Sequence, residues 1–560
     1  YIYNMRKLSF LFNFIPLLLL GLIVESCSKE GNVNAKSGSF VLKSLDVVCD
    51  YSKTNYVNVP FSGRDYKLNV TSSGDVTWSV EVVKGDIVTV TPEGEQKGDG
   101  EITISVAANP NKILGKKAEV LIKNSLNEDK CRLVFEQIEK VLYIPQETYV
   151  SKDPATFDDE NSDFNKLYMK EGDNVALFWQ KSLGRNPQSG PRPFNPDKML
   201  RLLEDAYSFM KNELHFCNVE NSVTDKYKLL AWVRDDNEGG ATGGGHNPVG
   251  EINIRPQHET ATNLLYHEVS HSFQFMSEFE GSFPRTTRWW MQGGPYEMTS
   301  QWTLLRRSPN WIDQEYNHFE RYVNNSHLSF ACKDLQYQNP YMFEYWANKH
   351  GVDIMSRLWL EGKNIDLDEN SEHGLNIIKI YKRITNITQE QLNAEMYDAA
   401  AHFMTWDIPT IEKAYSARGA NTHTCVLKKR GETYMIVPER CPGNYGYNGI
   451  KLKVPSAGTE VKVDFKGILS NAEYKISNVA YAEWRYGLVA VLKDGSRVYG
   501  EPSKEKTGTV SMNIPENTTY LWLVVAATPK KIFDIDSSNQ WPYQFTLKNT
   551  EPDTSKCTVE

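Results

Sequence analysis

Residues 264–276 of the chain read LLYHEVSHSFQFM, and this stretch decides how the middle of the protein folds. Its apolar residues recur every three to four positions, which is the period of an amphipathic α-helix. The apolar stripe consists of Leu265, Val269, Phe273 and Met276. We therefore expect a helix that is buried along one side.

The polar residues of this helix have the spacing of a zinc site. His267 and His271 are four residues apart, so their imidazoles project from one face, as two ligands of one zinc ion require. Glu268 follows the first histidine, where its carboxylate reaches a water molecule beside the metal. Zinc lowers the pKa of such a water to about 7, and the carboxylate takes its proton. The motif therefore predicts Zn²⁺-dependent hydrolysis with Glu268 as the general base.

A catalytic zinc needs a third protein ligand. The metzincin pattern places it six residues after the second histidine, where this chain has Ser277, so the metzincins are excluded. Pro295 predicts the start of a second helix, because proline favours the first helical position. This segment resembles the third-ligand helix of gluzincin peptidases, which implies that Glu297 binds the metal. By the same resemblance, Gln301 replaces an acid that orients a histidine ligand.

Two other interpretations of the second helix stay open. A helix dipole favours a negative charge in the first turn, so Glu297 is also consistent with an ordinary solvated acid. An alternative register aligns residues 290–293 with the Trp-x-Glu-Gly form of other gluzincins. In that register Gln292 stands at the ligand position, and zinc binding would be weak.

The wider pattern resembles an uncharacterised group of secreted bacterial gluzincin-like proteins, distantly similar to plant basic secretory proteins. The resemblance rests on the HExxHxxQ pattern that starts at His267, on the helix with Glu297, and on the aromatic stretches 445–448 and 541–543. It implies an α+β zincin-like domain over residues 150–420. It also implies hydrolysis of peptide bonds in extracellular proteins or glycoproteins.

The start of the chain predicts export. Basic residues 5–7 precede the apolar run 8–24, as in a signal peptide. Residues 24–27 resemble a bacterial lipobox, which implies that residues 1–27 are a signal segment and that Cys27 is lipidated. We expect an outer-membrane or cell-surface lipoprotein that reaches the membrane only through its lipid anchor. The alternative is a plain secretory signal and a periplasmic or freely secreted protein.

Residues 38–140 alternate between apolar and polar in short runs, which predicts the strands of a β-sandwich. The order of motifs, with Trp78-Ser79-Val80 and a closing Phe135-Glu136-Gln137, resembles the BACON module of Bacteroidetes. That resemblance implies an immunoglobulin-like fold. The family was named for suspected carbohydrate binding, but we expect a spacer between the lipid anchor and the catalytic domain.

The region before the HExxH helix predicts one helix and two strands. Asn195-Pro196-Asp197 introduces a helix over 198–214, and residues 227–233 and 251–254 have the pattern of strands. We interpret the glycine-rich stretch 239–250 as a mobile loop, and strand 251–254 as the sheet edge that pairs with substrate. His246 either decorates this loop, which we favour, or contacts the substrate. For an oxyanion donor the candidates are Tyr341 and Tyr345, although both also suit a helix core.

Residues 422–550 return to strand patterns and predict a second β-sandwich of jelly-roll type. A hairpin signal stands at residues 493–496. Glycan binding and a purely structural role are equally open for this domain. Cys425 and Cys441 flank a predicted hairpin, so a disulfide between them is permitted but not indicated.

Composition excludes one class of partner. The net charge is −9 and no Lys/Arg-rich run occurs, so nucleic acid is not an expected partner. Two hypotheses remain for a multidomain chain with two β-sandwiches around a zincin-like domain. The first is a lipid-anchored zinc peptidase that cleaves proteins or glycoproteins. The alternative is a non-catalytic glycan- or mucin-binding surface lipoprotein that retains the zincin fold.

Overall fold

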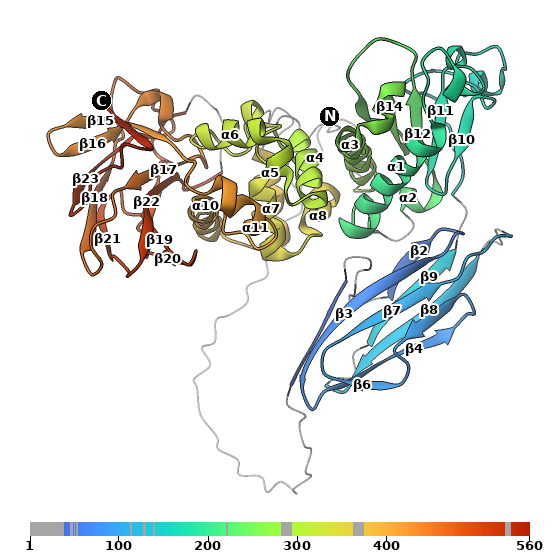
Figure 1. Cartoon of the computed structure of the whole chain (residues 1–560), viewed down its shortest axis with the longest axis horizontal. Helices are drawn as coiled ribbons and strands as arrows, with labels where there is room; N and C mark the ends of the chain where they lie inside the picture. The colour runs from blue at the N-terminus through green and yellow to red at the C-terminus, as the bar shows by residue number, and fades with distance from the viewer. Residues whose placement is uncertain are drawn as a thin grey trace, which may run out of the picture.

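The computed structural model describes residues 38–560, apart from 45–46, 48, 50, 52–53, 112–114, 127–129, 138–139, 220–221, 282–293, 362–374 and 533–538. The signal segment with Cys27 and the alternative register at 290–293 lie outside the described residues. Over these described residues the chain is a β-rich multidomain protein with five sheets and a group of helices (Figure 1). In the described part, no helix combines the length and apolar character needed to cross a membrane.

The N-terminal region is a sandwich of two sheets, with strand orders β1-β3-β7-β5 and β2-β9-β8-β4-β6. Buried and exposed residues alternate along its strands, so the inner faces form a core that includes Tyr66, Trp78 and Phe135. The strands are β1 (Gly38–Lys43), β2 (Thr54–Val59), β3 (Arg64–Gly74), β4 (Thr77–Lys84), β5 (Val88–Thr91), β6 (Glu95–Lys97), β7 (Gly100–Val106), β8 (Lys116–Asn124) and β9 (Lys130–Gln137).

A five-stranded mixed sheet of order β10-β11-β12-β14-β13 follows. Its strands are β10 (Met169–Glu171), β11 (Val175–Trp179), β12 (Leu229–Val233), β13 (Thr242–His246) and β14 (Val249–Ile254). The three central strands β11, β12 and β14 are parallel, whereas β10 and β13 run antiparallel to their neighbours. Every residue of β11 and β12 is buried, because both faces of the sheet are covered.

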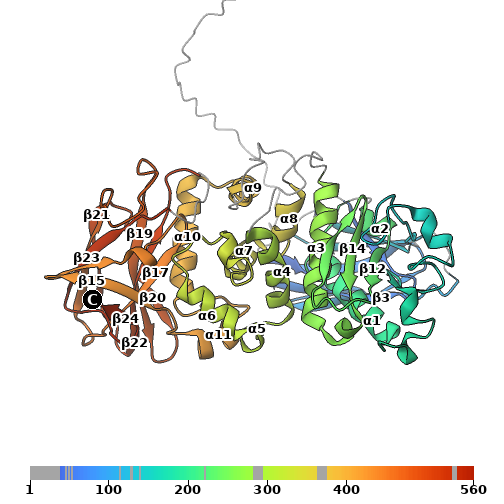
Figure 2. The same ribbon diagram turned by 90° about the horizontal axis from the view of Figure 1, so that it is seen from above.

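Helices α1 (Pro196–Ser208) and α3 (Thr262–Glu280) contact this sheet, and Figure 2 shows α3 lying between the sheet and the helices α4 (Gly294–Arg307) and α7 (Tyr341–His350). The expected helix after Asn195 is confirmed, since the Asn195 side chain accepts hydrogen bonds from the backbone of Asp197 and Lys198. It continues as a π-helical turn over Phe209–Glu213. The expected stripe of α3 is also confirmed, because Leu265, Val269, Phe273 and Met276 are buried.

Two expectations about the sheet are wrong. Residues 242–246 form strand β13 and are not a loop, and β14 lies inside the sheet, so β13 is the edge strand. The physical reason is the packing of α3. A Cβ on Gly243 would lie 2.0 Å from the backbone oxygen of Glu268, so only glycine lets this strand run beside the helix.

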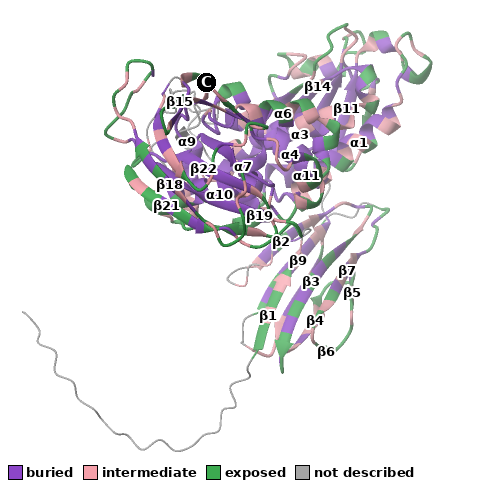
Figure 3. Cartoon of the chain, turned by 60° about the vertical axis from the view of Figure 1, so that its left-hand side comes forward, coloured by how far each residue is buried: buried purple, intermediate pink, exposed green. Residues whose placement is uncertain are grey.

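The short α2 lies beside α1 and α3, whereas helices α4 to α11 extend from α3 towards the C-terminal sandwich (Figure 1). They share one core with α3 and with part of that sandwich, and Figure 3 shows the buried residues of α7, α10 and β22. The helices are α2 (Val223–Lys226), α4 (Gly294–Arg307), α5 (Trp311–Gln314), α6 (Tyr316–Asn324), α7 (Tyr341–His350), α8 (Ile354–Leu360), α9 (Leu375–Thr385), α10 (Gln389–Phe403) and α11 (Glu412–Gly419).

The C-terminal sandwich pairs a six-stranded sheet, β21-β18-β23-β16-β15-β24, with a four-stranded sheet, β17-β22-β19-β20. The expected hairpin at 493–496 joins β19 to β20. The strands are β15 (Cys425–Arg430), β16 (Thr433–Ile436), β17 (Tyr447–Leu452), β18 (Glu460–Gly467), β19 (Trp484–Leu492), β20 (Arg497–Tyr499), β21 (Thr507–Asn513), β22 (Thr518–Ala527), β23 (Tyr543–Lys548) and β24 (Cys557–Val559).

The last strand corrects the expected end of this sandwich at residue 550. β24 pairs in parallel with β15, so the sheet includes Cys557–Val559. In this register Cys425 stands opposite Cys557 rather than Cys441. All three of these cysteines are buried thiols in the structure.

Candidate metal centre

Three side chains from two helices converge on one point. His267 and His271 come from α3, and Glu297 comes from the first turn of α4. The Oε2 atom of Glu297 lies 3.0 Å from Nε2 of His267 and 3.3 Å from Nε2 of His271, and the two Nε2 atoms are 3.1 Å apart. Of the described residues, only these three form a His, Cys, Asp or Glu cluster that could hold a metal ion.

The donor set fits zinc. Zinc binds histidine nitrogen and carboxylate oxygen at about 2.0–2.2 Å, so neighbouring ligands of a tetrahedral ion lie about 3.3–3.6 Å apart. The three separations agree with this spacing to within a few tenths of an ångström. Two imidazoles and one carboxylate also match the ligand types of catalytic zinc sites. With three protein ligands, a tetrahedral ion keeps one position for water or substrate.

The three side chains of the cluster are largely buried, and in Glu297 and His271 the contacts within the cluster offset the effect of burial on the pKa. The side chains of His271, His267 and Glu297 are 5%, 12% and 18% exposed, so the site is enclosed but reachable from solvent. Burial raises the pKa of the Glu297 carboxyl, but hydrogen bonds with His267 and His271 outweigh it and hold this pKa far below its usual range. Burial lowers the pKa of His271, and the contact with Glu297 more than reverses that effect. The carboxylate therefore stays ionised.

The ring of His271 is fixed from two sides. Its Nδ1 atom lies 2.9 Å from Oε1 of Gln274 and 3.2 Å from Oγ of Ser300. When Nδ1 carries the proton and donates it to Gln274, the lone pair of Nε2 faces Glu297 and His267. The ring also stacks on Tyr296, with ring centres 4.1 Å apart and an angle of 8° between the planes. The imidazole is thereby held with its Nε2 atom towards Glu297 and His267.

Gln301 does not have the expected role. Its Oε1 atom is buried without a hydrogen-bond partner in the described part of the chain, so it does not accept from His267 or His271 there. The orienting side chain is Gln274, which lies one helical turn after His271 on the same helix. Gln274 is itself held, since its Nε2 donates to the backbone oxygen of Tyr296 at 3.0 Å.

Glu268 lies on α3 beside the first histidine and is 5% exposed. Burial is the main cause of the raised pKa of Tyr296 and Tyr337, and the negative charge of Glu268 adds to it. In His271, burial lowers the pKa, and Glu297 followed by Glu268 raises it. Glu268 is therefore a neighbour of the cluster that does not belong to its donor set.

Tyr337 is a site residue that sequence reasoning missed. It precedes α7, its ring stacks on His267 with centres 6.2 Å apart, and it is 37% exposed. Burial of the hydroxyl group and the nearby Glu297 carboxylate, to which it hydrogen bonds, raise the pKa of Tyr337 to about 12. The two expected tyrosines lie elsewhere. Tyr341 is fully buried among aromatic rings, and Tyr345 donates to Asp398.

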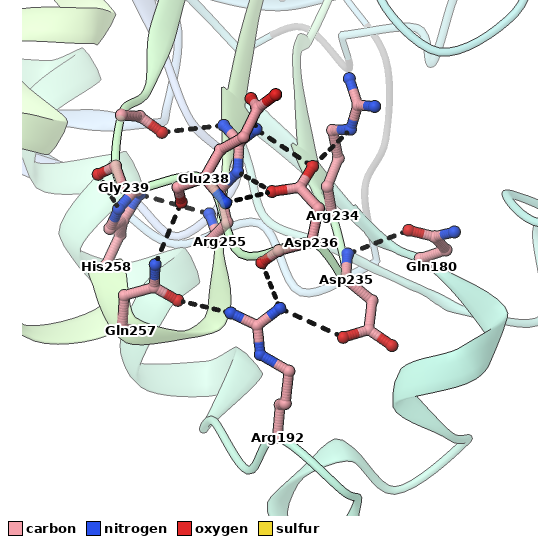
Figure 4. A network of polar contacts seen from close by, with 11 residues as sticks. Gln180, Arg192, Arg234, Asp235, Asp236, Glu238, Gly239, Arg255, Gln257 and His258 are labelled. Carbon is pink, nitrogen blue, oxygen red and sulfur yellow. Dashed lines mark hydrogen bonds and ion pairs between the residues drawn. The ribbon is translucent and has the colours of Figure 1, made fainter.

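The loop that leads into β13 is pinned by a network of charged residues (Figure 4). The buried side chain of Arg255, which follows β14, donates to Asp236 at 2.7 and 3.1 Å and to the backbone oxygen of Gly240 at 2.8 Å. The Arg255 guanidinium lowers the pKa of Asp236. Arg192 extends the network to Asp235 and Gln257. These bonds hold the start of the edge strand in place beside α3.

His246 lies at the end of β13 and is tied into the sheet. Its Nδ1 atom is 2.7 Å from Oε1 of the fully buried Glu251. The other carboxylate oxygen of Glu251 accepts from Nε1 of Trp232 at 2.6 Å and from the backbone of Tyr149 at 3.0 Å. The imidazole of His246 also contacts the ring of Tyr149 edge-on. This histidine therefore serves the sheet and is not among the converging donors.

A family model matches residues 135–554, which is most of the chain. That model describes a family of unknown function, DUF6055. The chain belongs to the DUF6055 family. The DUF6055 region starts within β9 and ends beyond β23, and it includes all four motif residues together with Gln274 and Tyr337. A search of curated proteins finds no match.

Solved structures resemble this DUF6055 chain only weakly. WR4, an MSP family member of C. elegans, is 16% identical over 15% of this chain and 91% of its own, with a TM-score of 0.12. The secreted serine protease VesC from Vibrio cholerae is 6% identical over 90% of this chain and 50% of its own, with a TM-score of 0.16. A family 123 glycoside hydrolase from Clostridium perfringens is 10% identical over 44% and 47%, with a TM-score of 0.12. The chain spans about half the length of the latter two proteins.

Proposed function

We propose that the chain is an exported, lipid-anchored zinc peptidase of the gluzincin type that hydrolyses proteins or glycoproteins. The observation that carries this proposal is the convergence of His267, His271 and Glu297 to within 3.0–3.3 Å, with Glu268 beside them. Structural zinc sites use four protein ligands, whereas catalytic sites use three. The count of three therefore favours catalysis.

The surrounding fold supports the same assignment. A mixed sheet with an antiparallel edge strand covers one side of α3, and a second helix, α4, supplies the carboxylate ligand. This arrangement is what the gluzincin resemblance implies for residues 150–420. The N-terminal sandwich then separates the catalytic domain from an anchor at Cys27.

The site residues divide the chemistry between them. A zinc ion at the three donors would act as a Lewis acid that polarises the scissile carbonyl and acidifies water. Glu268 accepts the proton of the attacking water and passes it to the amide nitrogen of the leaving group. The hydroxyl of Tyr337 donates a hydrogen bond to the carbonyl oxygen as negative charge develops there. Gln274 and Ser300 keep His271 in the tautomer that binds metal.

The edge strand provides a means of holding the substrate. β13 has a neighbour on one side only, and it runs alongside α3 at Glu268. An extended peptide can pair with its free backbone groups as an added strand. Main-chain pairing of this kind positions a peptide bond with little regard to its side chains, which suits an enzyme acting on many proteins.

The first test is metal content together with one substitution. The purified protein should contain about one zinc per chain, and Glu268→Gln should keep the zinc but lose at least a hundredfold in peptidase activity on casein or mucin. Glu320→Gln, which changes an exposed glutamate on α6, is the matched control and should remain fully active. A wild-type protein that binds no zinc would refute the proposal.

The same experiment separates the alternative hypothesis. A protein that binds zinc but leaves casein and mucin intact would favour the non-catalytic, glycan- or mucin-binding lipoprotein. The zinc content of Glu297→Gln tests the third ligand, because this substitution removes the negative charge without changing the size of the side chain. Loss of zinc in this variant would assign Glu297 as a ligand, whereas unchanged zinc content would return it to an ordinary first-turn acid.

A further inference from the structure

A cavity with several charged side chains in its lining lies between α10 and strands β19 and β20 of the C-terminal sandwich, far along the chain from His267, His271 and Glu297. Its volume is about 380 Å³, which is within the range of small-molecule sites. Interfaces between domains are common places for such sites. The residues that matter for its chemistry are Lys349, Glu395, Tyr397, Asp398, Arg485 and Tyr499.

Two carboxylates on α10 line the cavity, and each is anchored by one oxygen. Oε2 of Glu395 accepts from the hydroxyl of Tyr381 at 2.5 Å, and Oδ2 of Asp398 accepts from the hydroxyl of Tyr345 at 2.5 Å. Among the described residues, the second oxygens have longer ionic contacts only. Oε1 of Glu395 is 3.4 Å from Lys349, and Oδ1 of Asp398 is 3.6 Å from His402. These two oxygens are positioned to accept hydrogen bonds from a ligand.

Two positively charged side chains in the lining supply hydrogen-bond donors. Lys349 contributes an ammonium group, and Arg485 contributes a guanidinium whose side chain is 9% exposed. Arg485 forms an ion pair with Glu390 at 2.7 Å, but its Nε has no hydrogen-bond partner among the described residues. A buried donor without a partner costs free energy, so a ligand hydroxyl that accepts from it would bind favourably.

Tyr499 gives the cavity an aromatic wall. The ring is 37% exposed, and it is held in place by a hydrogen bond from its hydroxyl to Asp407 at 2.7 Å. It stacks on His402, with ring centres 4.7 Å apart and planes 19° apart. A fixed aromatic ring that stays partly exposed is a suitable platform for an apolar ring face.

The chemistry of the lining selects a class of ligand. The lining holds two carboxylates and two cations, with Glu390 beside Arg485 and His402 beside Asp398, so no large excess of either charge is present and a strongly charged ligand is not favoured. Adjacent donors and acceptors match a molecule whose hydroxyl groups both donate and accept. We propose that this cavity binds a neutral sugar ring, with Asp398, Glu395 and Arg485 hydrogen bonding to its hydroxyls and Tyr499 against its apolar face. The proposal does not depend on the activity of the metal centre.

The test is a binding experiment on the full chain carrying Glu268→Gln, which prevents any proteolysis. Galactose, N-acetylglucosamine and the disaccharide N-acetyllactosamine are titrated by calorimetry and by ligand-observed NMR, with N-acetylneuraminic acid as the charged probe. We expect at least one neutral sugar to bind, and Tyr499→Ala and Asp398→Asn each to weaken it at least tenfold. Tyr56→Ala, which removes an exposed tyrosine of the N-terminal sandwich, is the matched control and should bind normally.

Three outcomes would overturn the proposal. These are no binding of any neutral sugar, binding of the charged sugar alone, and binding that survives both cavity substitutions. Asp398→Asn retains the size of the side chain and an oxygen for Tyr345, so it guards against a loss that merely reflects misfolding. A circular dichroism spectrum and a melting temperature equal to those of the parent chain complete that control.

Discussion

Replacing Gln274 tests which side chain orients the metal ligand. Oε1 of Gln274 lies 2.9 Å from Nδ1 of His271, so Gln274→Ala removes the acceptor that fixes the ring and its tautomer. Loss of such a partner lowers metal affinity about 10- to 100-fold, which corresponds to about 1.4–2.8 kcal/mol. Ser300 lies 3.2 Å from the same nitrogen and can still accept from it. We therefore expect about a tenfold loss for Gln274→Ala, and a loss nearer a hundredfold for Gln274→Ala with Ser300→Ala.

The assay is competition for zinc against a chromophoric chelator at fixed pH, with folding checked by circular dichroism. Gln301→Ala is the matched control, because Gln301 is also a buried helical glutamine close to Glu297 in sequence, but its Oε1 accepts no hydrogen bond in the described structure. Its zinc affinity should stay within about twofold of the parent. If Gln301→Ala weakened zinc as much as Gln274→Ala did, the role read from the geometry would be wrong.

Three further predictions concern other parts of the chain. Tyr337→Phe should lower kcat about 10²- to 10³-fold with little change in KM, whereas Tyr345→Phe should leave both constants unchanged. Full activity of Tyr337→Phe in a peptidase assay would exclude the Tyr337 hydroxyl as the donor to the carbonyl oxygen. Burial lowers the pKa of His423 to about 3, below the usual value of about 6.5, so stability should fall as the pH drops from 6.5 towards 3. Between pH 7 and 4.5 the loss should be roughly 1–3 kcal/mol in thermal melts, and His423→Phe should reduce this dependence. The thiols of Cys49 and Cys131 are hydrogen-bonded to each other, so oxidation should join them in a disulfide. This disulfide should stabilise the N-terminal sandwich by about 4 kcal/mol. Non-reducing peptide mapping that finds no cross-link after treatment with oxidised glutathione would contradict this.

The metal cluster was open to prediction because its signal is local. The spacing of His267 and His271 sets their shared helix face, and Pro295 marks the start of the helix that carries Glu297. The structure brings these three donors together. The β-sandwiches were equally accessible, since alternation of apolar and polar residues along a strand is also local.

The residues that support the three donors were harder to predict from the sequence. Gln274 stands three residues after His271, so a helix wheel allows their contact, but Ser300 and Tyr337 reach the site through tertiary packing. Tyr337 lies before α7, and nothing in its neighbourhood in the sequence separates it from Tyr341 and Tyr345. Burial decides between the three tyrosines, because Tyr341 is enclosed in an aromatic core and Tyr337 remains exposed beside His267. That information exists only in the folded chain.

The edge strand shows why one feature escaped prediction. A strand is recognised by its alternating side chains, and residues 243–245 have none, so this stretch has the composition of a flexible loop. In the fold those glycines are required by contacts on both faces. A Cβ at position 243 would meet the Glu268 backbone, and one at position 244 would meet the hydroxyl of Tyr149 at 2.4 Å. The lack of side chains that conceals the strand in the sequence is therefore what allows it to lie against the helix that carries Glu268.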